Sequence, residues 1–283
     1  MLVHHFTVDV EEYFQVSALE SRVSRAEWDV LPGRVVESTR RLAGLLGEHG
    51  VCATWFVLGW VAQRYPGLVA ELVRGGHEIA SHGWDHRRVT MQTPAEFRRS
   101  VVHSKHLLED QAGQDVYGFR APSFSIVPGG EWAFDILLEA GYRYDSSLFP
   151  IRRRGYGFPG GARDVHGIER PGGSLTEVPP ATLRWARVNV PAGGGGYFRL
   201  LPYALTEQAF RQAERRGAAA TFYIHPWELD PDQPRIRVSP LTRARHYGGL
   251  ARTERRLHRL LSAFRFGPIA DTLGLRQREG ALR

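Results

Sequence analysis

The sequence predicts an α/β protein: a distorted (β/α) barrel with about seven parallel strands, built as a single domain. Short apolar, β-branched runs alternate with helix-patterned stretches, which is typical of a parallel sheet. No G-x-G-x-x-G motif follows the first apolar run, which argues against a dinucleotide-binding sheet. The 283 residues suffice for one barrel or two smaller domains. Because the alternation resumes after each glycine-rich stretch, we expect one domain over residues 1–283.

The predicted strands are short runs rich in apolar, β-branched or aromatic residues. LVHHFTVDV opens the chain as the first strand, and AAATFYIHPWE contains the last clear one. In chain order, we expect strands over residues 2–10, 51–58, 77–82, 116–122, 142–147, 175–180, 197–202 and 218–228.

The predicted helices lie between these runs. Thr93 and Glu96 form a capping box with Pro94 at the first helical position, which predicts a helix that begins there. We expect further helices over residues 32–50, 66–76, 131–141, 205–217 and 253–265, the last of which ends the ordered part. Residues 150–173, rich in glycine and arginine, and the glycine cluster at 192–196 are expected to form loops.

The charge and composition of the chain limit which partners and which cellular location we expect. The net charge is +7, and Lys105 is the only lysine. No basic run is interleaved with aromatic repeats, so we expect no nucleic-acid partner. The N-terminus MLVHHFTVDVEEY lacks the basic start and apolar stretch of a signal peptide. No apolar run of about 18 residues could span a membrane, so we expect a soluble, cytoplasmic protein.

Polar residues collect where the predicted strands end. In a parallel α/β barrel the active site lies at the C-terminal ends of the strands. Each predicted strand is apolar until its last residues and then turns polar. The candidate site residues, which share this position, are Asp9, Glu11, His82, His86, Arg120, Asp145 and His225.

A metal site explains the first four of these residues. Asp9 and Glu11 are two apart, so on a strand they face the same side. Glu12 faces the other side and is interpreted as structural or as a support for the metal ligands. Two crowded carboxylates repel, and a cation removes that cost. His82 and His86 with one carboxylate make a site with open positions for water, and the other carboxylate is placed to act as a base.

The chain resembles the polysaccharide deacetylases of the NodB-homology group (carbohydrate esterase family 4). The resemblance consists of five ordered motifs between residues 7 and 225. It departs from the family pattern at Val10, Gly83, Phe149 and Tyr223, and the Asp9-Val10-Glu11 order is that of a variant D-x-E branch. The matching segments are Thr7-Val8-Asp9, His82-Gly83-Trp84-Asp85-His86, Arg120-Ala121-Pro122, Asp145 with Phe149, and Tyr223-Ile224-His225.

The resemblance implies a role for each candidate residue. Asp9 is the base, steadied by Arg120, and His225 is the acid that protonates the leaving amine, with Asp145 tuning its pKa. The implied metal ligands are Glu11, His82 and His86. The implied metal is Zn, with Co, Ni, Fe and Mn as alternatives.

The C-terminal part resembles a narrower group. The segments HPWELDP and RHYGGLARTERRL look like a bacterial subgroup found beside exopolysaccharide and exosortase loci. That likeness implies a C-terminal extension at about 230–283. It also implies a substrate that is an N-acetylated exopolysaccharide or its lipid-linked precursor, and peripheral contact with the inner face of the membrane.

Two other functions stay open at this point: an amidohydrolase acting on a small amide, and a glycan-binding scaffold without turnover. The run Arg152-Arg153-Arg154 predicts a solvated face or a contact for an anionic glycan or lipid phosphate. Gly193 to Gly196 predicts a flexible loop or a close approach of a sugar to the backbone.

Overall fold

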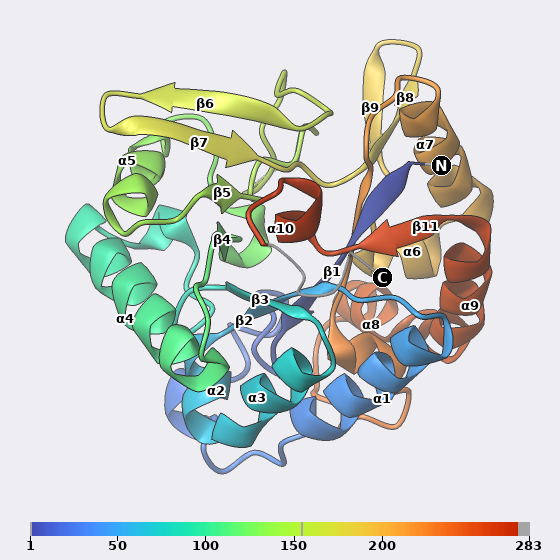
Figure 1. Cartoon of the computed structure of the whole chain (residues 1–283). Coiled ribbons are helices and arrows are strands. Elements are labelled where there is room, and N and C mark those ends of the chain that lie inside the picture. Colours follow the sequence, from blue (N-terminus) through green and yellow to red (C-terminus); the bar gives the residue numbers. More distant parts are fainter. Residues whose placement is uncertain (1, 154, 277–283) are drawn as a thin grey trace.

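The computed structural model describes residues 2–153 and 155–276, in which helices surround a central, mostly parallel sheet (Figure 1). The strands are β1 (Val3–Val10), β2 (Thr54–Val57), β3 (Glu78–Ser81), β4 (Gly118–Phe119), β5 (Tyr144–Asp145), β6 (His166–Arg170), β7 (Gly173–Glu177), β8 (Thr182–Trp185), β9 (Val188–Pro191), β10 (Thr221–Ile224) and β11 (Arg265–Gly267). The helices are α1 (Val35–Glu48), α2 (Gly59–Arg64), α3 (Pro66–Arg74), α4 (Pro94–Ala112), α5 (Trp132–Glu139), α6 (Gly195–Leu200), α7 (Tyr203–Glu214), α8 (Pro240–Tyr247), α9 (Thr253–Ala263) and α10 (Ile269–Thr272).

The main sheet has the order β10-β1-β2-β3-β4-β5-β7-β6, and β11 pairs with β1. From β10 to β7 every neighbouring pair is parallel, and β6 and β7 are antiparallel. Just beyond β7, Pro180 forms a parallel bridge to Thr221 of β10. The Ala181 N–H donates to the Thr221 carbonyl at 2.9 Å. The segment after β7 therefore reaches the strand at the other end of the ladder, and the predicted barrel with about seven parallel strands is confirmed.

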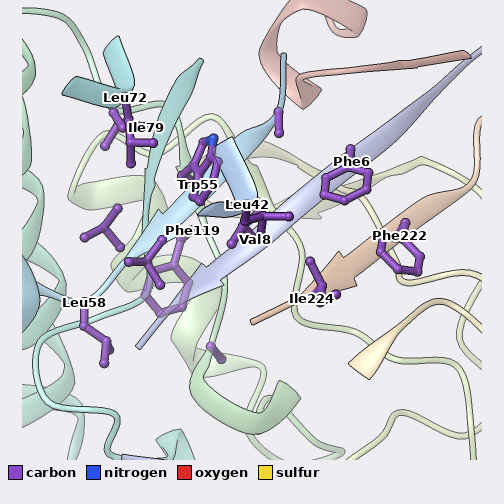
Figure 2. Close-up of a cluster of buried hydrophobic side chains, with 14 of the residues drawn as sticks. Phe6, Val8, Leu42, Trp55, Leu58, Leu72, Ile79, Phe119, Phe222 and Ile224 are labelled. Atoms are coloured by element: carbon purple, nitrogen blue, oxygen red, sulfur yellow. The ribbon is translucent and has the colours of Figure 1, made fainter. Parts of the chain in front are cut away.

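The alternation of β1 separates the core from the site. Phe6 and Val8 lie in the main hydrophobic core with Leu42 of α1 (Figure 2). Thr7 and Asp9 point to the other side, where both contact Arg120. Because residues two apart on a strand share a face, β1 contributes an apolar side to the helices and a polar side to the barrel interior.

Most predicted elements are confirmed, including the capping box at α4, in which the Thr93 side chain accepts from the Glu96 N–H. Three predictions are wrong. Residues 197–202 are largely helix α6 instead of a strand, because Gly194 and Gly195, with φ of 145° and 55°, turn the chain into a helix there. The expected loop 150–173 contains strand β6. The helix that was expected to end the ordered part, α9, is followed by β11 and α10. Within the described ranges, no helix is long and apolar enough to cross a membrane.

Candidate active site

Five of the predicted residues line one cavity at the C-terminal ends of the parallel strands. The cavity has a volume of about 340 Å3. Its lining includes Asp9 and Glu11 from the end of β1, His82 and His86 from beyond β3, and His225 from the end of β10. Since neighbouring parallel strands end at the same edge of the sheet, residues more than 200 positions apart in sequence are brought together.

Glu11, His82 and His86 form a buried group suited to a metal ion. One ligand atom from each lies within 4.8 Å of the others. Their side chains are nearly inaccessible to solvent. Glu11 Oε2 lies 2.7 Å from His86 Nε2, yet among the described residues it accepts no hydrogen bond. A bound cation would give this buried oxygen a ligand bond in place of the missing hydrogen bond.

The orientation and charge of these groups also fit a metal site. His82 Nδ1 lies 2.8 Å from the Arg120 carbonyl, which can only accept, so Nδ1 carries the proton and Nε2 is free to bind a metal. Burial lowers the pKa of His82 to about 4. Burial opposes ionisation of Glu11, but the neighbouring His86 and His225 outweigh it and lower the pKa of Glu11 to about 2. A neutral imidazole and an ionised carboxylate are the forms that bind metal.

Asp9 is held by a buried arginine. Arg120 Nη1 donates to Asp9 Oδ1 at 2.7 Å and to Thr7 Oγ1 at 2.8 Å, while Nη2 donates to Ser146 Oγ at 2.8 Å. The Arg120 side chain is fully buried. The other oxygen, Asp9 Oδ2, lies 3.8 Å from His225 Nε2. One carboxylate oxygen is therefore anchored, and the other lies beside the imidazole.

His225 is oriented by a carboxylate that sequence reasoning missed. His225 Nδ1 donates to Glu228 Oε1 at 2.7 Å, and Glu228 Oε2 pairs with Arg199. His225 Nε2 lies 3.6 Å from Glu11 Oε1. Burial lowers the pKa of His225, but Glu11, Glu228 and Asp9 outweigh it and raise this pKa to about 9. The sequence signal was the glutamate three residues after His225 in HPWE, since a 3-10 turn (Pro226–Leu229) brings positions three apart together.

The tuning of His225 by Asp145 stays a prediction, and the structure shows the Asp145 side chain bound to Ser147. Asp145 accepts from the Ser147 side chain at 2.7 Å and from the Ser147 N–H at 3.0 Å. It lies beside Glu177, and burial and this Asp145 charge raise the pKa of Glu177 well above its usual value. Because Ser147 also accepts from the Ala121 N–H at 2.8 Å, Asp145 stabilises the turn next to Arg120. The carboxylate that contacts His225 Nδ1 is that of Glu228.

Glu12 and the arginine run lie apart from this centre. Both oxygens of Glu12 accept from the Arg34 N–H, at 3.0 and 2.9 Å, and Glu12 is not among the residues that line the cavity in the described part of the chain. Burial raises the pKa of Glu12 to about 7. Arg152 and Arg153 are exposed, and Arg154 lies outside the described residues.

Two family models match the chain, in adjacent stretches. Residues 22–144 match the polysaccharide deacetylase family, and residues 146–274 match a domain of unknown function, DUF3473. Asp9 and Glu11 precede the first match, and His225 and Glu228 lie in the second.

Among curated proteins, the peptidoglycan-N-acetylglucosamine deacetylase PgdA of Listeria monocytogenes is 36% identical over 77 residues. These residues are 27% of this chain and 16% of that protein. The chain therefore matches only a small part of the length of this relative.

Two solved structures share the fold over nearly the whole chain. A protein assigned as a polysaccharide deacetylase from Pseudomonas aeruginosa PAO1 gives a TM-score of 0.63 at 16% identity, covering 99% of this chain and 92% of that one. A Mycobacterium smegmatis protein of the same assignment gives 0.62 at 20% identity, covering 99% and 93%. These likenesses show that the chain shares the fold of both structures, and residues 22–144 are similar to the polysaccharide deacetylase family.

Proposed function

We propose that the chain hydrolyses N-acetyl groups of amino sugars in an exopolysaccharide or its lipid-linked precursor. The observation that carries the proposal is the convergence on one cavity of a buried Glu11-His82-His86 group, a free carboxylate oxygen of Asp9 and the imidazole of His225. Metal-dependent amide hydrolysis needs a Lewis acid, a base and an acid within reach of one reacting group.

Glu11, His82 and His86 are the proposed metal ligands. A divalent ion bound there, Zn²⁺ or alternatively Co²⁺, Ni²⁺, Fe²⁺ or Mn²⁺, supplies Lewis-acid polarisation of the acetamide carbonyl. Three protein ligands leave positions open for water and substrate, as in catalytic rather than structural zinc sites.

The chain's own residues move the protons. Asp9 Oδ2, the oxygen that Arg120 leaves free, accepts the proton of the attacking water. The water oxygen bonds to the carbonyl carbon, the carbon–nitrogen bond breaks, and acetate and a free amine result. His225 Nε2 donates a proton to the leaving amine, and Glu228 on Nδ1 keeps Nε2 turned toward the cavity.

A panel assay tests this proposal. Acetate release is measured from chitooligosaccharides, peptidoglycan fragments and N-acetylated exopolysaccharide, with added metal and with a chelator. We expect release that the chelator abolishes and that Asp9→Asn reduces. No release from any substrate at saturating metal contradicts the proposal and favours a glycan-binding scaffold.

An amidohydrolase acting on a small amide is the second candidate. The cavity of about 340 Å3 is small enough to favour it, since ligand pockets span roughly 300–1,000 Å3. Small linear and cyclic amides therefore belong in the same panel. The link to exopolysaccharide loci, the cytoplasmic location, the peripheral membrane contact and the extension at about 230–283 stay predictions.

A further inference from the structure

The cavity has a second wall, which comes mostly from the half of the chain that matches DUF3473. Tyr156, Tyr197 and Tyr223 line it together with Phe124. The Tyr156 and Tyr197 hydroxyls are hydrogen-bonded to each other, and Phe124 packs edge-on against Tyr223 with ring centroids 4.9 Å apart. Aromatic faces beside hydroxyl groups offer both apolar and hydrogen-bonding surface, which suits a sugar ring.

Glycines allow the backbone to join this wall. A side chain at Gly195, which has φ of +55°, would begin 2.7 Å from the Tyr223 ring. Gly195 and Gly196 both line the cavity. A residue larger than glycine would fill this part of the cavity and displace Tyr223, so the close approach depends on glycine.

The wall carries positive charge without a paired acid. Arg245 of α8 lines the cavity and is exposed, and within residues 2–153 and 155–276 no carboxylate pairs with it. The Arg153 guanidinium lies 5.7 Å from the Tyr197 ring centroid and likewise has no acidic partner in that part of the chain. Arg88, which also lines the cavity, differs because it pairs with Glu20 at 3.0 Å.

Among the described residues that line the cavity, the acidic groups come from the end of β1. Within the described lining, Asp9 and Glu11 are the carboxylates, and Arg120 and the histidines already compensate both. Burial raises the pKa of the Tyr156 hydroxyl overall, but Arg153 and Arg245 both act to lower it, so both cations lie close to this phenol. The charge of the wall is therefore available to an anion.

A stack of rings sets the spacing between this wall and the reacting centre. The His225 and Trp227 rings stack with centroids 5.2 Å apart, and Trp227 and His246 stack at 4.5 Å. Arg245 directly precedes His246. Arg245 and this stack line the same cavity as His225, so the basic wall and the reacting centre face one space.

We propose that Tyr156, Tyr197 and Arg245 form a subsite for an anionic group on the substrate, next to the N-acetylated sugar. The anion is a carboxylate of a neighbouring uronic acid or a phosphate at the reducing end of a lipid-linked precursor; a guanidinium binds either with charge-assisted hydrogen bonds. This inference rests on the proposed function and names the class of its substrate.

Kinetics on three matched substrates test the subsite and separate the two sources of charge. They are a neutral N-acetylated oligosaccharide, the same with a uronic acid beside the N-acetyl sugar, and an N-acetylhexosamine 1-phosphate. We expect kcat/KM for at least one charged substrate to exceed the neutral value by about tenfold or more, with the gain shrinking at high ionic strength. Arg245→Gln should bring the ratio close to one.

Arg235→Gln is the matched control. Arg235 lies over the Tyr247 ring at 4.4 Å, is outside the cavity lining and has the same charge, so its loss should leave the ratio unchanged. Equal kcat/KM for neutral and charged substrates, or a preference that Arg245→Gln retains, overturns the subsite. Calorimetry of the same ligands with Asp9→Asn tests the subsite separately from turnover. If no substrate releases acetate, that result refutes the proposed function alone.

Discussion

Replacing Glu228 by glutamine tests whether a residue outside the expected motif set controls the general acid. Glutamine keeps the shape of the side chain but loses the charge that Oε1 presents to His225 Nδ1 at 2.7 Å. The imidazole then loses both a firm orientation and the carboxylate that stabilises its protonated form. Acid–base steps contribute about 10²–10⁴-fold. Because the pair is buried and short, we expect kcat to fall by that range, about 3–5 kcal/mol of barrier.

The same substitution has a cost in stability that must be measured separately. Glu228 also pairs with Arg199, and both side chains are almost completely buried. Breaking a buried ion pair by removing one partner costs about 3–5 kcal/mol, because the other charge is left uncompensated. The double variant Glu228→Gln/Arg199→Met removes both charges. It should recover much of the unfolding free energy without recovering turnover.

Steady-state acetate release, metal content and thermal unfolding are measured on each variant, with Asp145→Asn as the comparison. Asp145 stabilises a turn through Ser147, so its loss should reduce kcat at least tenfold less than the loss of Glu228. The reasoning is refuted if metal-loaded, folded Glu228→Gln turns over at the wild-type rate, or if Asp145→Asn is the more damaging of the two.

Three further predictions follow from the geometry. Glu11→Gln should lower metal affinity by more than about 100-fold, while Glu12→Gln should retain the metal. Elemental analysis checks this, and the reverse result would make Glu12 the metal ligand. Asp9→Asn should keep the metal and lose about 10²–10⁴-fold in kcat; a near-normal rate with full metal occupancy excludes Asp9 as the base. The pKa of Glu177 is raised in the folded state, so the folded chain keeps a proton that the unfolded chain releases. The free energy of unfolding therefore falls as pH rises above about 4.5. Glu177→Gln should flatten that fall in denaturant unfolding between pH 5 and 8, and an unchanged slope would show that another group causes it.

The strand ends were predictable because they follow from local pattern and topology alone. Asp9 and Glu11 share a face by the period of a strand, and parallel pairing then places His82 and Arg120 at the same edge. Asp145 meets the same two criteria, yet its side chain is held by Ser147 beside Glu177. A position at a strand end determines at which edge of the sheet a side chain lies, but it does not determine which residues that side chain contacts.

Other features depend on contacts that no local pattern encodes. Glu228 is oriented by Arg199, which comes from a helix that the sequence favoured as a strand because Tyr197 and Phe198 are strand-like residues. The helix begins only because Gly194 and Gly195 adopt positive φ, and the sequence permits that backbone without requiring it. The HPWE spacing places Glu228 near His225, but the arginine that pairs with Glu228 was recognisable only once these segments were seen together.

The pairing of β1 with β10 has a consequence for synthesis of the chain. β1 and β2 are complete once residue 57 has been made, but the partner on the other side of β1 is residues 221–224. At roughly 5–20 residues per second, about 8–33 s of translation separate the two. During that time an apolar strand edge stays open to pairing with other nascent chains. We therefore expect chaperone demand and aggregation to rise when elongation is slowed, and chains that end before Thr221 to aggregate at any rate of synthesis.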